Sequence, residues 1–140
     1  MEDFTSFICF QFGSISRRIQ KHYNNLYRQH GITLGQSFIL FALFQNEGLS
    51  LSAMADKLQL DNSAITGLVD RMESDYLLVR EVDPADRRSF LIHLTEKGRA
   101  LAKTVFPVAN DFNHQLKNSL SSEEQKSLFK LLGTLDQLIN

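Results

Sequence analysis

Apolar residues recur at steps of three and four over residues 4 to 29, and this period predicts one long amphipathic helix that ends before Gly31. The apolar run SFILFALF follows Thr33 and Gln36, whose spacing predicts a capping box at the start of a second helix. Because this second helix is apolar on nearly every side, we expect it to lie in the core.

Two shorter helices are predicted after Gly48. The segment SLSAMADKL has helical spacing with one apolar side, which we expect to point inward. The residues of that side are Leu51, Met54, Ala55 and Leu58. A tight connection, QLD, leads to the next helix, which Asp61 or Asn62 can cap and which runs to about Asp75.

The period changes from 3.6 to 2 in the segment that follows. Phe90, Ile92 and Leu94 fall on one face and Ser89, Leu91 and His93 on the other, which predicts a strand. LLVREV is its natural antiparallel partner, so we predict a two-stranded hairpin with DPADRR at its tip.

The tip of this hairpin concentrates charge. In an extended strand Asp86 and Arg88 lie on the same side, so we expect the carboxylate to hold the guanidinium in a fixed direction. Arg87 then faces the other way. The alternative is a hairpin tip that only aids solubility and whose ion pairs contribute little to stability.

Two helices complete the predicted fold. Thr95 caps the first, in which Pro107 should produce a kink. Ser121 and Glu124 form a second capping box ahead of the last helix. The fold class is therefore mainly α with a small β-hairpin (α+β), in the element order of a winged helix-turn-helix.

The second helix of such a motif enters the DNA major groove, so its outer face should be small and polar near its start. That description fits the helix after QLD, and the alternative is the solvated face of a packing helix. The candidate DNA contacts on it are Asn62, Ser63, Thr66, Gly67 and Arg71. The first three can reach phosphate groups or base edges from the helix amino terminus.

Composition and charge narrow the function. The 140 residues are 43% hydrophobic and 22% charged, which is ordinary for a globular protein. The net charge of −1 is unevenly spread, because residues 4 to 46 carry four cations and no acid. The amino terminus is acidic and no apolar run approaches ~20 residues, so we expect a cytoplasmic protein without a membrane partner.

The sequence contains few residues arranged for catalysis or for metal binding. The single cysteine, Cys9, excludes an internal disulfide and every multi-thiolate zinc site. The histidines have no metal-binding spacing, and neither a phosphate loop nor a dinucleotide glycine pattern occurs. We therefore expect no enzyme, no metal and no cofactor.

Most of the chain resembles the MarR (multiple antibiotic resistance) family of transcription regulators. The most specific match is the wing pattern D-x-R followed by alternating residues and L-T-x-x-G, here Asp86, Arg88, Leu94, Thr95 and Gly98. The resemblance implies a homodimer that binds a pseudo-palindromic double-stranded DNA operator, with half-sites ~10 base pairs apart. It also implies that Arg88 enters the minor groove, while Arg87 is left for phosphate.

The resemblance also divides the chain. Residues 1–32 and 100–140 would form a helical dimerisation region, and residues 33–99 a winged helix-turn-helix DNA-binding lobe. The apolar surface near the amino terminus and on the last helix is more than one small lobe can cover, which favours a dimer independently. Repression is the commoner mode among relatives. The competing hypothesis, a winged helix used only for protein contacts, predicts an uncharged or acidic wing.

Relatives often bind a small phenolic or aromatic anion between the dimer helices and the DNA lobe. Candidate ligand-binding residues are Phe12, Arg17, Tyr23, Phe38 and Phe41, and an ordinary aromatic core is the alternative. Arginine would donate to a carboxylate of such an effector.

Cys9 and Tyr23 resemble the organic-peroxide-sensing branch, in which tyrosines hydrogen-bond a reactive cysteine. The positions of that branch's two other tyrosines hold Gly13 and Leu34, so we favour a buried inert cysteine over redox sensing.

Two departures from the family pattern affect the predicted recognition helix. Gly67 stands where many relatives have arginine, which removes a DNA contact and weakens the helix by ~1 kcal/mol relative to alanine. Tyr76 stands where relatives commonly have a helix-ending glycine, which predicts a different or a strained helix end.

Overall fold

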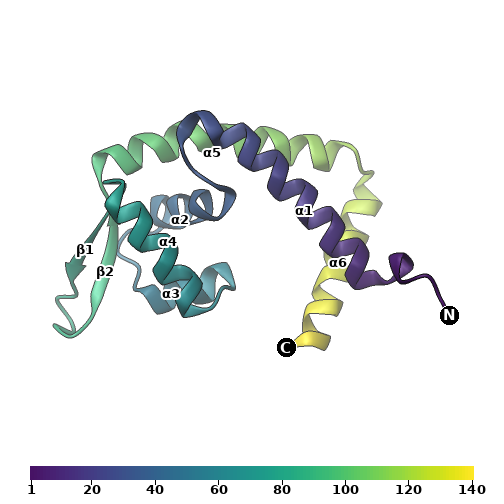
Figure 1. Ribbon diagram of the computed structural model, residues 1–140, viewed down its shortest axis with the longest axis horizontal. Helices are drawn as coiled ribbons and strands as arrows, with labels where there is room; N and C mark the ends of the chain where they lie inside the picture. The colour runs from purple at the N-terminus through teal and green to yellow at the C-terminus, as the bar shows by residue number, and fades with distance from the viewer. The chain divides into compact units, whose positions relative to one another are not determined.

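The computed structural model describes residues 1–140 (Figure 1). It consists of six α-helices, two short 3-10 helices and one antiparallel hairpin. In chain order the elements are η1 (Phe4–Ser6), α1 (Ile8–Tyr27), η2 (Arg28–His30), α2 (Leu34–Gln45), α3 (Leu51–Leu58), α4 (Asn62–Ser74), β1 (Leu78–Val82), β2 (Phe90–Leu94), α5 (Glu96–Asn118) and α6 (Ser122–Ile139). The mainly α class with one hairpin is confirmed. None of the helices combines the length and the apolar character that crossing a membrane requires.

The first predicted helix is three elements instead of one. Phe7 has extended backbone angles, so the turn of η1 is separate from α1. Asp3 stabilises this turn by accepting a hydrogen bond from the Thr5 N–H at 3.0 Å. The predicted end is confirmed, because Gly31 follows η2 in the left-handed conformation with φ 71°.

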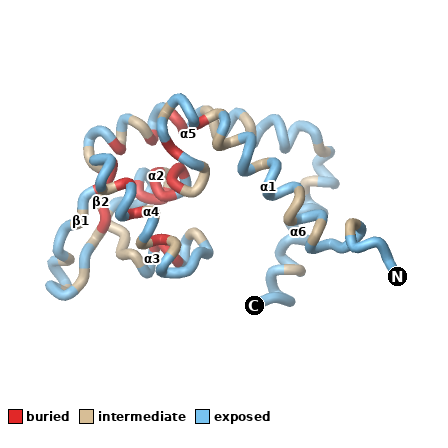
Figure 2. Tube along the Cα trace, in the orientation of Figure 1, coloured by how far each residue is buried: buried red, intermediate tan, exposed pale blue.

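Helix α2 lies at the centre of the core, where it contacts α1, α3, α4 and β2. The capping box is confirmed: the Gln36 N–H donates to the Thr33 hydroxyl at 3.3 Å, and the Thr33 N–H donates to the Gln36 side chain at 2.9 Å. Buried residues concentrate on this helix in Figure 2. The expectation that it is buried on nearly every side is wrong at Phe38 and Phe44, which remain 47% and 37% exposed because no other element of the chain covers that side fully.

Helices α3 and α4 form the predicted helix-turn-helix. Gln59 ends α3 in the left-handed conformation, and Asp61 rather than Asn62 caps α4. The inward side of α3 is buried at Met54 and Ala55 and half-buried at its two leucines. Helix α4 attaches to the core through three fully buried side chains, Ile65, Val69 and Met72.

The hairpin pairs β1 with β2 in one register. Leu78 lies opposite Leu94 at the base, Arg80 opposite Ile92, and Val82 opposite Phe90 toward the tip. Leu49 adds a bridge to Ile92. The predicted face is confirmed, but its burial is graded along the strand: Ile92 is fully buried and Phe90 is 50% exposed.

The chain divides into two compact units, Met1–Phe106 and Pro107–Asn140. The division falls inside α5, which continues through Pro107. Thr95 opens α5 as predicted, since its hydroxyl accepts from the Gly98 N–H at 3.0 Å. In the second unit, the capping box of α6 is confirmed with its Ser121 N-cap.

Candidate nucleic-acid interface

The outward face of α4 is polar at its amino-terminal end. Asn62, Ser63, Gly67 and Arg71 are exposed and Thr66 is half-buried, so all five candidates on this helix share one lobe and are accessible. The Thr66 hydroxyl donates to the Asn62 carbonyl at 2.7 Å, which leaves its oxygen available as an acceptor. No atom lies within 4 Å of a methyl group built at Gly67, so the backbone there is open to close approach.

An additional group, Asp61, lies at the same end of α4. Its carboxylate accepts hydrogen bonds from the Ala64 N–H at 2.7 Å and the Ser63 hydroxyl at 3.0 Å. These bonds, with the Ala64 N–H first, lower the pKa of Asp61 from its ordinary value. The sequence predicts Asp61 only as a cap, but its exposure puts a negative charge on the face that carries the candidate contacts.

The tip of the hairpin differs from the extended geometry that we expected. Residues 86 to 89 form a turn closed by the Ser89 N–H, which donates to the Asp86 carbonyl at 2.9 Å. Asp86 and Arg88 do pair, at 3.3 Å from carboxylate oxygen to Nε. They meet because the chain reverses, and the carboxylate also accepts from the Arg88 backbone N–H at 3.1 Å.

The Asp86 carboxylate therefore organises the turn in addition to orienting one arginine. Its bond with the Arg88 backbone N–H, followed by that with the guanidinium, lowers the pKa of Asp86. A second carboxylate, Asp83, accepts from the Ala85 N–H at 2.9 Å on the other side of the tip.

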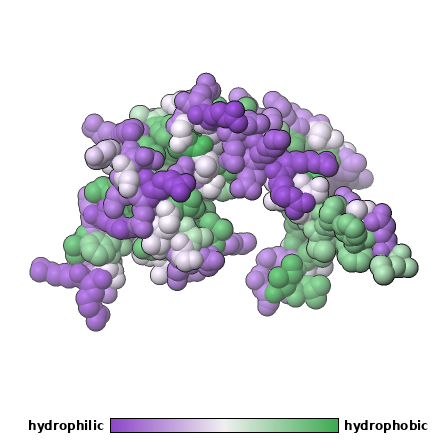
Figure 3. All heavy atoms as spheres, viewed as in Figure 1, coloured by the Kyte–Doolittle hydropathy of each residue, from purple (hydrophilic) through white to green (hydrophobic).

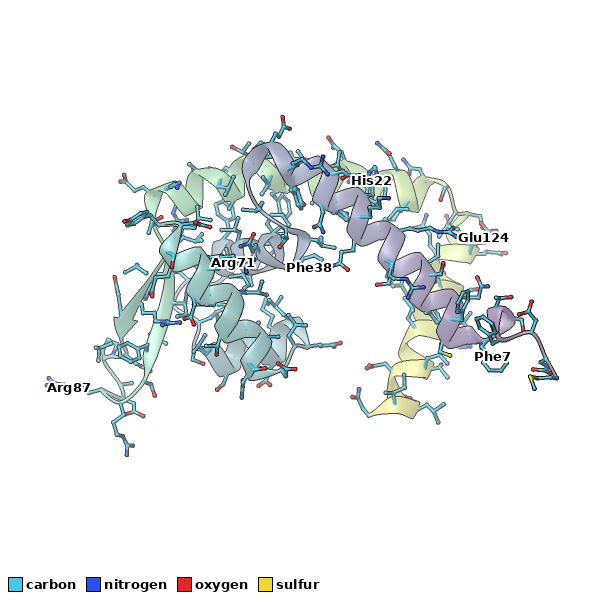
Figure 4. All side chains as sticks on the ribbon, viewed as in Figure 1. Phe7, His22, Phe38, Arg71, Arg87 and Glu124 are labelled. Carbon is cyan, nitrogen blue, oxygen red and sulfur yellow. The ribbon has the colours of Figure 1, made fainter.

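The two tip arginines extend into solvent. The Arg88 side chain is 92% exposed although it pairs with Asp86. Figure 4 shows Arg87 at the far end of the hairpin, pointing away from the helices. In Figure 3 the tip of the hairpin is coloured hydrophilic. The wing thus presents two exposed guanidinium groups at its end, and Asp83 and Asp86 balance their charge within the same turn.

An open groove of about 540 Å³ lies between α4, the start of α3 and the hairpin. Its lining residues are Ser50, Leu51, Ser52, Thr66, Asp70, Arg80, Arg88, Ser89 and Phe90. Arg80 joins the two walls, because it pairs with Asp70 and also lies 3.7 Å from Glu73 on α4. This pairing offsets part of the negative charge at this end of α4 and ties the hairpin to the helix.

The candidate effector residues do not line this groove. Phe12 and Arg17 lie exposed on α1, Phe38 is exposed on α2, and Tyr23 and Phe41 are half-buried. Phe41 packs edge-on against the Phe106 ring at 5.1 Å between centroids, and Phe106 itself remains 42% exposed. A second open groove, of about 440 Å³, lies elsewhere in the first unit. Its lining residues are His30, Gly31, Ile32, Asp75, Leu77, Lys97, Ala100, Leu101 and Thr104.

Cys9 is exposed, so the expectation of a buried cysteine is wrong for this chain. It lies in the first turn of α1. Tyr23 follows fourteen residues later on the same helix, which separates the two by ~21 Å along the axis at 1.5 Å per residue. A hydrogen bond between Cys9 and Tyr23 of one chain is therefore excluded.

Comparisons with known proteins agree with this architecture. The sequence profile of the MarR family matches residues 32–90, which include α2, α3, α4 and the hairpin up to its second strand. The organic hydroperoxide resistance transcriptional regulator of Bacillus subtilis is 33% identical over 132 residues, covering 93% of this chain and 90% of that protein. The regulator MgrA of Staphylococcus aureus is 29% identical over 90% of this chain and 85% of its own length.

The fold is found among solved structures as well. A structure of S. aureus MepR in complex with DNA superposes with a TM-score of 0.89 over 96% of this chain and 97% of that chain, at 24% identity. The winged-helix fold is therefore shared over almost the full length. With the identity to the B. subtilis regulator, these findings establish that the chain belongs to the MarR family of transcription regulators.

Proposed function

We propose that this regulator binds a pseudo-palindromic operator as a homodimer, with α4 in the major groove and the hairpin tip in the adjacent minor groove. The observation that carries the proposal is the combination, on one lobe, of an exposed polar face on α4 and two arginines, Arg87 and Arg88, that extend from the hairpin tip. The S. aureus MepR structure is of a DNA complex, which supports this use of the shared fold.

The roles on α4 follow from accessibility. Asn62, Ser63 and Thr66 present short polar groups suited to base edges, and Arg71 presents a cation suited to phosphate. The open backbone at Gly67 lets DNA approach closely. Because the Asp61 carboxylate already occupies the amino terminus of α4, a phosphate is less favourable there than the helix dipole alone would suggest.

The roles at the wing follow from the turn. Arg88 enters the minor groove, where a narrow A·T-rich segment concentrates negative potential, and Arg87 takes a phosphate. Asp86 keeps the turn closed and Arg88 directed. The negative charge of Asp86 near DNA opposes binding. Asp86 therefore favours binding only by fixing the geometry of the turn.

The dimer would use the apolar surface of residues 1–32 and 100–140, leaving residues 33–99 as the DNA-binding lobe. Phe4 and Ile8 in the first unit and Phe129 and Leu131 in the second are each about 60% exposed, which is a large apolar surface for one chain in water. We propose that the protein is cytoplasmic and that it represses the gene that it controls.

The effector is proposed to be a small phenolic or aromatic anion that contacts the exposed ring of Phe38 and the guanidinium of Arg17. A second candidate is an oxidant. It is favoured by the exposure of Cys9 and by the likeness to a regulator of organic hydroperoxide resistance. The helical separation of Cys9 and Tyr23 requires that any tyrosine holding the thiol come from the other chain of the dimer.

Binding of the purified dimer to the DNA upstream of its own gene tests the proposal, at ~50 mM salt with reductant and without ligand. Arg88→Ala should weaken binding by about tenfold or more, because a minor-groove cation is removed from each lobe. Lys103→Ala removes the same charge from an exposed position on α5 and should leave the affinity nearly unchanged. Absence of binding by the parent protein would contradict the proposal.

Two compounds added to this binding assay distinguish the two classes of effector. A salicylate-like anion should release DNA from the parent protein, and peroxide should do so only if Cys9 is the sensor. A Cys9→Ser variant that still released DNA under peroxide would eliminate the thiol mechanism.

A further inference from the structure

Phe90 is an unexplained feature of the DNA-binding lobe. It lies opposite Val82 in the hairpin register, on the face that continues from the buried Ile92 and Leu94. Both members of this pair are half exposed, at 50% for Phe90 and 51% for Val82. Two large apolar side chains therefore extend the inner face of the hairpin beyond the core that it covers.

The surroundings of Phe90 are polar and charged. It lines the groove of about 540 Å³ together with the side chains of Arg80, Arg88 and Thr66. The lining residues include two arginines and one acid, Asp70, and Arg80 neutralises that acid. An exposed apolar patch with a polar rim indicates a binding surface, and the exposed guanidinium of Arg88 suits a partner that carries both apolar atoms and negative charge.

The geometry of the proposed DNA complex identifies the partner. The major and the minor groove are separated by one sugar-phosphate strand, so a protein with α4 in the first and the wing in the second must place that strand between them. The groove lies between these two elements. The deoxyribose rings of the strand offer apolar C–H surface, and its phosphates offer negative charge.

We propose that this groove seats one DNA strand and that Phe90, supported by Val82, contacts its deoxyribose. This inference rests on the proposed function. The hydroxyl of Ser52 at the groove edge is suited to a flanking phosphate, and Arg88 extends from the other edge toward the minor groove. Arg80 is a positioning residue, because it keeps the Asp70 carboxylate from repelling the strand.

A deoxyribose contact predicts a distinctive energetic signature. Phe90→Ala should weaken operator binding by the dimer about tenfold, since each of the two lobes buries less apolar area. The slope of log affinity against log salt should not change, because the variant keeps every phosphate-binding side chain. Unrelated duplex DNA should lose affinity by a similar factor, because deoxyribose carries no sequence information.

The test measures fluorescence anisotropy of labelled operator and of unrelated duplex, across a salt series, for four proteins. These are the parent, Phe90→Ala, Phe90→Leu and Val79→Ala, the last being an apolar truncation on the opposite face of β1. Phe90→Leu should keep most of the affinity, and Val79→Ala should bind like the parent.

Three results would overturn the inference: equal affinities for Phe90→Ala and Val79→Ala, a reduced salt slope in Phe90→Ala, or a loss of affinity confined to the operator. Thermal unfolding shows whether Phe90→Ala still folds. If it does not, Phe90→Leu decides, because a leucine that fills the site should bind DNA like the parent. If the parent protein binds no DNA, the proposed function fails instead, irrespective of Phe90.

Discussion

At the level of single residues, Tyr76 ends the recognition helix in the left-handed conformation, with φ 59°. Its side chain is 76% exposed, so packing does not compensate for this backbone strain. The following Leu77 N–H donates to the Met72 carbonyl at 2.9 Å, which is the long hydrogen bond of a Schellman-type helix end. In such a helix end the left-handed position, here Tyr76, is usually glycine.

Tyr76→Gly should therefore raise the free energy of unfolding by about 0.5–1 kcal/mol, because glycine adopts this conformation without strain. Tyr76→Ala keeps the strain and should give no gain. Urea unfolding at one chain concentration measures both. A stability of Tyr76→Gly no higher than that of Tyr76→Ala would contradict the strain, because both variants lack the ring and differ only in how readily the backbone adopts this conformation.

A second residue, Gly98, joins the hairpin to α5. A methyl group there would overlap the carbonyl oxygen of Leu77, which accepts a hydrogen bond from the Thr95 N–H at 3.1 Å. Gly98→Ala should lower the free energy of unfolding by about 1–3 kcal/mol. Gly133→Ala, in the open middle of α6, should instead stabilise by about 0.5–1 kcal/mol. Equal effects in thermal unfolding would contradict this role of Gly98.

Several residues of the candidate site follow from spacing alone, and others do not. Pairing of Asp86 with Arg88 was predictable, but its cause was not, because the alternation that suggests a strand gives no sign of the turn at 86 to 89. The exposure of Cys9 and Phe90 was also unpredictable, since an apolar or thiol side chain in a periodic segment is normally buried.

At the level of elements, caps and turns hold the DNA-binding lobe in shape. Capping boxes and the helix-turn-helix could be predicted because their hydrogen bonds connect residues three positions apart. The length of the first helix could not, since the extended backbone of Phe7 interrupts an apolar period that continues across it. The graded burial along β2 reflects which element lies opposite each residue, which periodicity does not encode.

The caps predict a response to acid. The Ala64 N–H lowers the pKa of Asp61, and the Arg88 N–H lowers that of Asp86, in each case from an ordinary value of 3.8. Because the folded-state pKa is the lower one, these bonds stabilise fully above about pH 4 and are lost as pH falls through the folded-state value.

Nuclear magnetic resonance can follow this loss through the amide shifts of Ala64 and Arg88. Both should titrate with midpoints below 3.8. Midpoints above 3.8 would show that the two carboxylates do not accept these bonds in solution.

At the level of the whole molecule, the chain leaves apolar surface uncovered in both of its compact units. On α6 the exposed apolar residues are Leu128, Phe129, Leu131, Leu132, Leu138 and Ile139. We propose that a second copy of the chain covers them. The sequence predicts the same dimer, because it holds more apolar surface than one small lobe can cover.

Leu131→Glu should therefore shift the protein from dimer to monomer, because a buried carboxylate at the interface would be desolvated. Lys130→Glu introduces a carboxylate at a neighbouring exposed position and tests whether added charge alone has this effect. Sedimentation equilibrium distinguishes the two. A parent protein that is monomeric at micromolar concentration, or a Leu131→Glu variant that stays dimeric, would contradict the proposed interface.

The central claim is that the dimer holds DNA through phosphate and groove contacts from α4 and the wing. Its most direct measurement is the salt dependence of operator affinity for the parent and for Arg87→Ala. The claim predicts a steep linear fall of log affinity with log salt, and a slope in the variant that is shallower by about one unit for each phosphate left without its arginine. No binding at ~50 mM salt, or identical slopes and affinities for the two proteins, would contradict it.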